Sequence, residues 1–274
     1  MLGGQNFLHM SKKFSFVGAG KMASAIVCGM LEGASAKVSE IECVCGNDKT
    51  GESLAQKTGI SLAETLSDLS GDIFVLAYKP QQLAEVALSL KNAKPRIMLS
   101  ILAGTTVARL RQAFPQAQNI VRVMPNLPAL ISQGVSCYAV EKPLNAADKA
   151  QIEALLRSIG ETVECAEKDL DAVTALSGSG PGYIFEFASA MIEAGVKLGL
   201  SPEVAKKLCV ETFAGSGMLM KTQNASPEEL RNAVSSPGGT TLAALDVFEK
   251  SNLREITARA MASAKKRAEE LSAM

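Results

Sequence analysis

The sequence predicts an α/β domain with a doubly wound, mostly parallel sheet, followed by an all-α domain. Short, almost wholly apolar runs alternate with helix-like patterns up to about residue 168, as expected for strands of a parallel sheet covered on both faces. Beyond residue 169 the strand-like runs disappear and the spacing is helical. A chain of 274 residues is long enough for two domains. We therefore expect one domain over residues 12–168 and a second over residues 169–274.

The stretch FSFVGAGKMA, from Phe14 to Ala23, has the pattern that opens a dinucleotide-binding unit. An apolar strand would end at the glycines and a helix would follow. Gly18 would allow the tight turn, Gly20 would let a pyrophosphate approach the backbone, and Ala23 would keep helix and strand close. Free N–H groups at the helix start favour phosphate. Such a string also occurs in ordinary loops, but its place after the first strand indicates a Rossmann-type domain that binds a cofactor through Gly18, Ala19, Gly20, Lys21, Met22 and Ala23.

The end of the second predicted strand, Ile41 to Cys45, bears on the choice of cofactor. NAD-selective domains usually place an acidic side chain there, to bind the ribose 2′-hydroxyl. Here Asn47 follows the strand, and its neutral amide, with Lys49 nearby, would tolerate a 2′-phosphate. Asp48 could instead serve as the N-cap of the next helix. We expect NADPH, with NADH as the alternative.

Three further strands, Asp72–Ala77, Ile97–Leu102 and Asn119–Met124, should end in a row at one edge of the sheet, where ligands bind. Lys79 would then meet an anion of the cofactor or substrate, or it is simply a solvated lysine. Asn126 could bond the nicotinamide or substrate through its amide, or satisfy its own turn. With strands at Gly134–Val140 and Glu161–Cys165 and a helix at Ala146–Ile159, the sheet should have about eight strands.

The second half should contain a helix from Asp169 that breaks at Ser177–Gly182, where three glycines and a proline occur. The next helix, Tyr183–Leu198, is too apolar to have one face in water. Further helices are expected at Pro202–Thr222, Pro227–Ala233 and Leu253–Leu271. Such a domain is too apolar to be exposed to water as a monomer, and the simplest way to bury its apolar surface is a homodimer.

A second glycine-rich motif, VSSPGGTTLAAL, spans Val234 to Leu245. Its turn leads into a helix, so free N–H groups, hydroxyls and the positive end of a helix dipole come together. This combination suits a carboxylate, and the candidate binding residues are Ser235, Ser236, Gly238, Gly239, Thr240 and Thr241. The alternative is a plain helix start with Ser235 or Ser236 as the N-cap.

The composition of the chain argues against several classes of partner and of site. Lys and Arg together number 28, as do Asp and Glu, so the net charge is zero and neither nucleic acid nor a membrane surface is an expected partner. No apolar run approaches the roughly 18–20 residues of a membrane span, and no signal peptide is expected before the first strand. The six cysteines suggest reduced thiols in a cytoplasmic protein, with no metal or redox role. The lone histidine, His9, lies in an aperiodic leader, residues 1–11, that we exclude from the fold.

Five motifs follow one another in order over residues 13–272: VGAGKMA at Val17–Ala23, AYKP at Ala77–Pro80, RVMPNLPA at Arg122–Ala129, LSGSGPGYIF at Leu176–Phe185 and VSSPGGTT at Val234–Thr241. With these motifs the chain resembles the pyrroline-5-carboxylate reductase family. The resemblance implies a helical domain that interlocks with that of a second copy. It also implies NADPH-dependent reduction of the cyclic imine pyrroline-5-carboxylate to L-proline, the last step of proline biosynthesis. Family members often assemble as decamers of five dimers.

The resemblance also implies roles for single positions. Gly18 to Ala23 would hold the pyrophosphate, and Asn47 would lie near the 2′-phosphate. The adenosine and nicotinamide side would be lined by Ala77, Tyr78, Lys79, Pro80, Ala103 and Gly104. The substrate carboxylate and ring nitrogen would be held by Ser236, Gly239, Thr240 and Thr241, with Glu167 nearby. The sequence departs from the family pattern at Lys21, Leu127 and Glu64, where many members have Asn, Thr and an adenine-contacting Asn; the last leaves the adenosine contact open.

The chemistry agrees with the composition. Reduction of a ketone needs a positioned proton donor, commonly His, and the chain has one His, in the leader. An imine nitrogen can arrive protonated from water, so the protein needs only to orient it and stabilise its charge. Thr241 is the candidate catalytic residue, as hydrogen-bond partner of that nitrogen.

Two rival functions remain open. A β-hydroxyacid dehydrogenase or imine reductase relative would share the domain order, and the hydroxyacid branch needs a catalytic lysine in the helical part. Lys197, Lys206 and Lys207 lie on charged faces, away from the glycine- and serine-rich turns. A non-catalytic NADP-sensing regulator would keep the Gly18–Gly20 turn but would not need Ser235 to Thr241.

Overall fold

The computed structural model describes residues 12–46 and 48–273. They form two compact units, one of residues 12–178 and 264–273 and the other of residues 179–263. The first is the α/β unit and the second the helical unit. The predicted boundary after residue 168 stays a prediction. The calls on Asn47, His9 and the leader lie outside the described residues.

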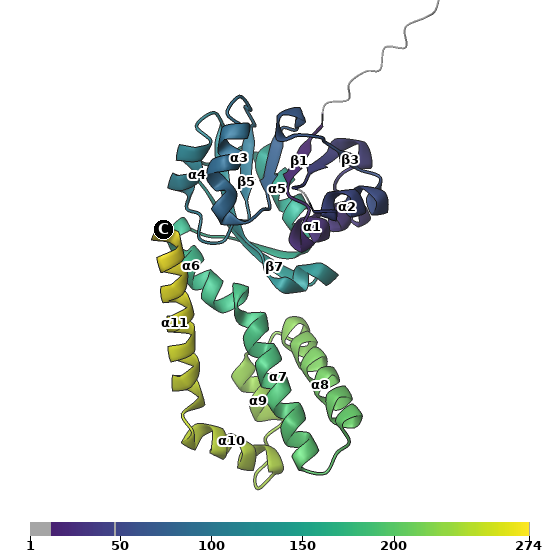
Figure 1. Cartoon of the computed structure of the whole chain (residues 1–274). Helices are drawn as coiled ribbons and strands as arrows, with labels where there is room; N and C mark the ends of the chain where they lie inside the picture. The colour runs from purple at the N-terminus through teal and green to yellow at the C-terminus, as the bar shows by residue number, and fades with distance from the viewer. Residues whose placement is uncertain (1–11, 47, 274) are drawn as a thin grey trace, which may run out of the picture. The chain divides into compact units, whose positions relative to one another are not determined.

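The α/β unit is built on one eight-stranded sheet with the order β3-β2-β1-β4-β5-β6-β7-β8 (Figure 1). Neighbours pair in parallel except β6 and β7, which are antiparallel. The order 3-2-1-4-5-6 is that of a Rossmann fold, so the predicted fold class is confirmed. The strands are β1 (Phe14–Val17), β2 (Ile41–Val44), β3 (Ser61–Leu62), β4 (Ile73–Leu76), β5 (Ile97–Ser100), β6 (Asn119–Met124), β7 (Gly134–Val140) and β8 (Gly160–Glu164).

Helices cover both faces of this sheet, and the core therefore has two halves. On one face Ile26 and Met30 of α1 and Leu156 of α5 pack on Phe14 and Phe16 of β1. On the other face the apolar side chains of α3 and α4 pack on β4 and β5. This double burial explains why β1, β2, β4 and β5 are buried at every residue. The helices are α1 (Lys21–Glu32), α2 (Thr50–Thr58), α3 (Leu83–Ser89), α4 (Val107–Ala113), α5 (Ala146–Arg157) and α6 (Leu170–Val173).

Short helical turns connect these elements: η1 (Val38–Glu40), η2 (Leu66–Asp68), η3 (Pro80–Gln82), η4 (Leu127–Ile131) and η5 (Glu167–Asp169). The two-residue strand β3 was not predicted, because both of its residues are exposed and form no apolar run. The predicted break in the helix from Asp169 is confirmed: α6 passes into a π-helical turn, η6 (Thr174–Gly178), before the next helix begins. A Cβ at Gly178 would displace the terminal methyl of the Met124 side chain.

The helical unit consists of α7 (Gly180–Lys197), α8 (Pro202–Thr222), α9 (Pro227–Ala233), α10 (Thr240–Lys250) and most of α11 (Leu253–Ala273). Phe187 of α7 packs on Phe213 of α8 and on Phe248 of α10, with ring centroids 6.2 and 6.1 Å apart. Yet only Pro181, Ala205 and Cys209 of this unit are buried. No helix of the described residues is long and apolar enough to cross a membrane.

Glu42 is a buried carboxylate in the sheet, only 5% exposed. Its Oε1 accepts hydrogen bonds from Ser15 Oγ at 2.5 Å, Ser70 N at 2.6 Å and Gly71 N at 3.2 Å. These donors lie in β1 and in the loop that leads into β4. The carboxylate therefore joins three neighbouring segments of the α/β unit at one atom.

We predict that Glu42→Ala lowers the thermal unfolding midpoint by about 5–10 °C, because buried donors lose their acceptor. Glu42→Gln, which keeps an acceptor oxygen, should lose less. Glu85→Ala, an exposed glutamate of α3, serves as the matched control and should shift the midpoint by less than about 2 °C. Scanning calorimetry measures all three, and equal midpoints for the two alanine variants would contradict the role given to Glu42.

Candidate active site

A cavity of about 660 Å³ lies at the carboxyl edge of the sheet, around the glycine turn. Four loops line it: those after β1, β2, β4 and β5. The structure brings most of the predicted cofactor residues together here: Gly18, Ala19, Gly20, Lys21, Met22, Ala23, Ala77, Tyr78, Lys79, Pro80 and Ala103. Asn47 lies outside the described residues, while its neighbours Gly46 and Asp48 line the cavity.

The glycine turn is shaped by a close approach of two backbones. Gly18 has φ +102°, and a Cβ there would come within 2.5 Å of the carbonyl oxygen of Ala77. Gly20 is the N-cap residue of α1 and has no side chain to bond the first-turn amides. A Cβ at Gly20 would meet nothing within 4 Å, so its side faces open space. The turn therefore offers free N–H groups at a helix start with room beside them, which fits a pyrophosphate.

The loop after β2 holds the acidic side chain that sequence reasoning considered. The N-cap of α2 is Lys49, so the interpretation of Asp48 as the N-cap is wrong by one residue. Asp48 Oδ1 accepts from Thr50 Oγ1 at 2.5 Å and Thr50 N at 3.1 Å. These two bonds hold the pKa of the Asp48 carboxyl below its usual value. Asp48 is thus charged at neutral pH, and its Oδ1 is already engaged with the start of α2.

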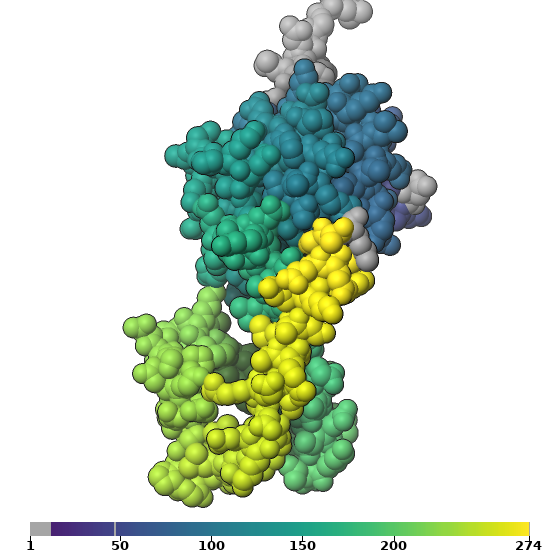
Figure 2. All heavy atoms as spheres, turned by 90° about the vertical axis from the view of Figure 1, so that its left-hand side faces the viewer, coloured from purple at the N-terminus to yellow at the C-terminus, as the bar shows by residue number. Residues whose placement is uncertain are grey.

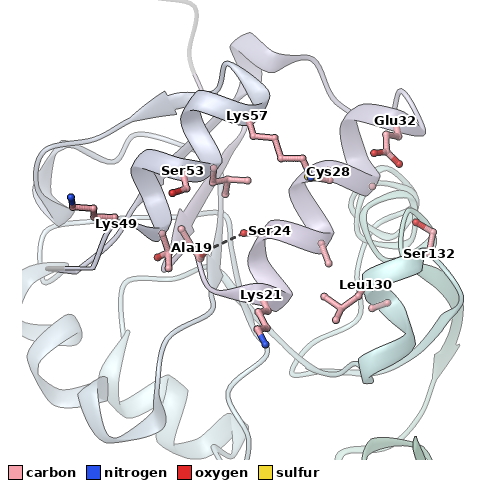
Figure 3. Close-up of a pocket in the computed structure, with 15 residues that line it drawn as sticks. Ala19, Lys21, Ser24, Cys28, Glu32, Lys49, Ser53, Lys57, Leu130 and Ser132 are labelled. Carbon is pink, nitrogen blue, oxygen red and sulfur yellow. Dashed lines mark hydrogen bonds between the residues drawn. The ribbon is translucent and has the colours of Figure 1, made fainter. Parts of the chain in front are cut away.

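A second groove, of about 620 Å³, lies between α1, α2 and η4 and shares Ala19, Lys21 and Thr50 with the first cavity. Figure 3 shows Lys57 extending from α2 toward Cys28 of α1, and the hydroxyl of Ser24 bonded to the carbonyl of Ala19. Lys21, Lys49 and Lys57 make this side of the glycine turn positive, with Glu32 as the one acidic lining residue. Lys21 and Lys49 were named from the sequence. Lys57 and Glu32 were missed, because apolar periodicity defines only the buried faces of α1 and α2.

The loop after β4 carries Tyr78 and Lys79. Lys79 is exposed at the cavity, as both readings of it require, and its backbone N–H bonds Gln82 Oε1 at 3.3 Å. The ring of Tyr78 packs against the apolar cluster of the α3–α4 face. Its hydroxyl is buried and has no hydrogen-bond partner among the described residues, and burial raises the pKa of this phenol.

Two predicted residues lie elsewhere. Gly104, at φ +65°, is not among the cavity-lining residues; a Cβ there would come within 2.8 Å of Leu271 Cβ, in the carboxyl-terminal turns drawn yellow in Figure 2. Asn126 is also outside the cavity lining, and its Oδ1 accepts from Val135 N at 2.9 Å. The side-chain oxygen of Asn126 therefore bonds the start of β7, and a contact of its amide with the nicotinamide or substrate stays a prediction.

Glu167 lies in η5, within the α/β unit. Its Oε1 accepts from Val107 N at 2.6 Å, at the start of α4, and from Arg122 Nη1 at 3.3 Å. The Arg122 side chain is only 8% exposed and also reaches Asp171 at 3.7 Å. Sequence reasoning missed this buried arginine, although it begins the RVMPNLPA motif. Glu167 is therefore a positioning residue for η5 and α4 in this structure, and contact with a substrate stays a prediction.

The second glycine-rich motif begins α10, as predicted. The N-cap is Gly239, so the alternative in which Ser235 or Ser236 caps the helix is wrong. Ser235 Oγ instead donates to the carbonyl of Arg231 at 2.6 Å, and the turn closes through Gly239 N to Ser236 O at 2.9 Å, with Gly238 at φ +72°. Because no side chain caps α10, the N–H groups of its first turn are open beside the hydroxyls of Thr240 and Thr241. This arrangement can hold a carboxylate.

The described residues contain no group of three or more His, Cys, Asp or Glu side chains that could hold a metal ion. Lys197, Lys206 and Lys207, the candidate lysines of the rival dehydrogenase reading, are all exposed.

Comparison with known proteins shows which families this chain is similar to. Residues 167–271 match the family described as pyrroline-5-carboxylate reductase dimerisation, and residues 13–104 match the family described as NADP oxidoreductase coenzyme F420-dependent. The pyrroline-5-carboxylate reductase of Corynebacterium melassecola is 36% identical over 93% of this chain and 97% of its own length. Pyrroline-5-carboxylate reductase 2 of Bacillus subtilis is 34% identical over 95% of both chains.

Two solved structures are similar to this chain in both fold and sequence. That of a pyrroline-5-carboxylate reductase from Coxiella burnetii superposes with a TM-score of 0.89, at 32% identity over 96% of this chain and 99% of that one. The Plasmodium falciparum pyrroline carboxylate reductase, solved with NADP bound, has a TM-score of 0.84 at 30% identity, over 95% of this chain and 98% of that one. With its motifs, its fold and its relatives in agreement over nearly the whole chain, this protein belongs to the pyrroline-5-carboxylate reductase family.

Proposed function

We propose that this chain catalyses the reduction of L-1-pyrroline-5-carboxylate to L-proline with NADPH, the last step of proline biosynthesis. The observation that carries the proposal is the start of α10, where open backbone amides adjoin two threonine hydroxyls in a chain of this family. Such a group binds a small carboxylate. The glycine turn of the α/β unit supplies the second requirement, a place for a dinucleotide.

The residues present fit a nicotinamide dinucleotide. Gly18 to Ala23 would hold the pyrophosphate on the first-turn amides of α1, and Ala77 to Pro80 with Ala103 would line its sides. The bound dinucleotide supplies the hydride. Gly104 and Asn126 are retained only as more remote candidates, because neither lines the cavity.

NADPH is proposed over NADH on the charges around the glycine turn. Lys21 and Lys49 provide positive charge, and Oδ1 of Asp48 is occupied by Thr50. The second oxygen of Asp48, Oδ2, takes no part in the bonds to Thr50, so the preference for NADPH rests on the two lysines. Asn47 is part of the same proposal, and NADH remains the alternative cofactor.

The chain's own residues can meet the demands of imine reduction. The amides of Thr240 and Thr241, with Ser235, Ser236, Gly238 and Gly239 around them, would hold the carboxylate, and Thr241 would bond the ring nitrogen. A protonated imine gains a hydride at carbon and becomes a neutral secondary amine, so no proton donor of the protein is required at that step. This suits a chain whose single histidine is His9. Glu167 is the proposed acidic neighbour of the substrate.

The rival functions fit less well. A hydroxyacid dehydrogenase would need a lysine held beside the reacting group, whereas the three candidate lysines are exposed. A sensor of NADP would have no use for the uncapped, hydroxyl-flanked start of α10.

The helical unit supports a homodimer. Large apolar side chains are exposed on α7, α8 and α10, including Phe185 at 56% and Leu198, which follows α7, at 87%. Only three residues of the unit are buried, and exposed apolar surface of this kind marks a site of protein–protein contact. We propose that a second copy covers it; a decamer of five dimers is the larger assembly that the family suggests. Six free cysteines suit a cytoplasmic location.

We predict that the purified protein oxidises NADPH when pyrroline-5-carboxylate is added, followed by the loss of absorbance of the reduced nicotinamide. 2-Keto acids should not oxidise NADPH, because the chain's one histidine, the common proton donor to an alkoxide, is His9 in the leader. 3-Hydroxy acids, which are already reduced, should not reduce NADP⁺ either. The kcat/KM with NADPH should exceed that with NADH. If the protein binds NADPH but does not turn over the imine, the proposed reductase activity is contradicted and the NADP-sensing function is favoured.

We predict that Thr241→Ala lowers kcat by about 10–100-fold, the loss expected when a positioned hydrogen bond to the reacting nitrogen is removed. The affinity for NADPH should change little. Thr241→Ser keeps the hydroxyl and should retain most of the activity, and Thr222→Ala, at an exposed threonine of α8, controls for the substitution itself. Steady-state kinetics decide: wild-type kcat in Thr241→Ala would remove Thr241 from the mechanism.

A further inference from the structure

The carboxyl-terminal turns of α11 belong to the α/β unit. The helix begins in the helical unit, but its residues 264–273 group with the sheet. Ser272 Oγ donates a hydrogen bond to Asp171 Oδ1 of α6 at 3.2 Å, and Figure 1 shows this end of α11 beside α6. One residue earlier the helix touches the loop after β5, because a Cβ at Gly104 would lie 2.8 Å from Leu271 Cβ and 3.1 Å from its carbonyl oxygen. The backbones of the loop and of α11 are therefore in direct contact.

The far end of the same loop is held by a cluster of charged side chains that α11 also contacts. Asp171 Oδ1 lies 3.7 Å from Arg122 Nη2, and Arg122 Nη1 lies 3.3 Å from Glu167 Oε1. Glu167 Oε1 in turn accepts from Val107 N, where α4 begins, at 2.6 Å. The loop from β5 to α4 is thus held near its middle by α11 itself and at its end by a cluster joined to α11.

This loop forms part of the wall of the cofactor cavity. Ile101, Leu102 and Ala103 line the cavity, whereas Leu271 and Ser272 are not among its lining residues. In the sheet, β5 lies beyond β4, on the opposite side of β1 from β2. The end of β2 binds the adenosine ribose in Rossmann folds, so the loop after β5 lies on the side of the nicotinamide half. Any influence of α11 on that half must pass through the loop.

We propose that the carboxyl-terminal turns of α11 position the loop after β5 for the nicotinamide half of the cofactor. Leu271 and Ser272 are positioning residues in this role, since they act through the loop and not on the cofactor. Gly104, at φ +65°, permits the contact because it has no side chain to hold the helix away. Two backbones in contact have no side chain that can rotate aside, so a shift of the helix moves the loop. The inference rests on the proposed cofactor site.

The first test changes the loop side of this contact. Gly104→Ala adds a methyl group that would meet Leu271. Gly59→Ala is the matched control for backbone strain, because Gly59 has φ +78° and a Cβ there would have only Val38 Cγ1 within 4 Å, at 3.5 Å. We predict that Gly104→Ala weakens NADPH binding by about tenfold in isothermal titration calorimetry. Binding of 2′,5′-ADP, which lacks the nicotinamide, should be unchanged, and Gly59→Ala should bind both ligands as the wild type does.

The second test changes α11 alone and leaves the loop sequence intact. Ser272→Ala removes the hydrogen bond to Asp171 and should weaken NADPH binding by about threefold, with 2′,5′-ADP binding unchanged. Ser272→Thr keeps a hydroxyl and should restore the wild-type affinity. Ser263→Ala, at an exposed serine of the same helix, is the matched control and should bind both ligands normally.

The comparison of the two ligands separates positioning from a general loss of structure. Equal weakening for NADPH and 2′,5′-ADP overturns the inference, and so does wild-type NADPH affinity in a folded Gly104→Ala or in Ser272→Ala. Should Gly104→Ala fail to fold, the serine variants decide. Calorimetry needs no turnover, so failure of the proposed reduction would be seen separately, as no loss of NADPH absorbance when wild-type protein is mixed with pyrroline-5-carboxylate.

Discussion

The cofactor cavity depends on one contact, the approach of the Gly18 backbone to the carbonyl of Ala77. Gly18 has φ +102°, and a Cβ there would lie only 2.5 Å from the carbonyl oxygen of Ala77. Any residue larger than glycine would therefore force the backbone to move. The contact sets the turn after β1 against the loop after β4, the two neighbouring strands between which the chain changes direction in the sheet. The free amides of α1 and the lining residues Tyr78 and Lys79 are brought to one cavity by it. The site is therefore a consequence of backbone packing more than of any single polar side chain.

Each unit contains a helix whose N-cap residue is glycine, which has no side chain to bond the first-turn amides: Gly20 before α1 and Gly239 before α10. Fixed amide dipoles attract an anion without adding charge, which agrees with a chain whose net charge is zero. One such site suits a pyrophosphate and the other a small carboxylate. A cyclic imine that can be protonated by water asks for little more, so a reductase of this kind can work without a catalytic histidine.

Much of this could be predicted from the sequence, because it depends on local pattern. Strand-like runs located seven of the strands, and α8 and α9 begin and end where their prolines and polar residues indicate. The edge strand β3 could not be predicted, since two exposed residues leave no pattern. The hydrogen-bond partners of side chains could not be predicted either. The bonds of Asn126 to Val135 and of Glu167 to Arg122 join segments that only the folded sheet brings together. The hydroxyl of Tyr78, which has no partner among the described residues, likewise depends on packing and could not be predicted from the AYKP motif.

The most direct test of the account is the affinity of Gly18→Ala for NADPH, measured by calorimetry on protein whose circular dichroism matches the wild type. The methyl group would meet the carbonyl of Ala77, so the loop after β4 must shift and the cavity must change shape. The account predicts that binding weakens by at least about 100-fold while the fold is retained. Wild-type affinity in the folded variant would show that the cavity does not depend on this contact.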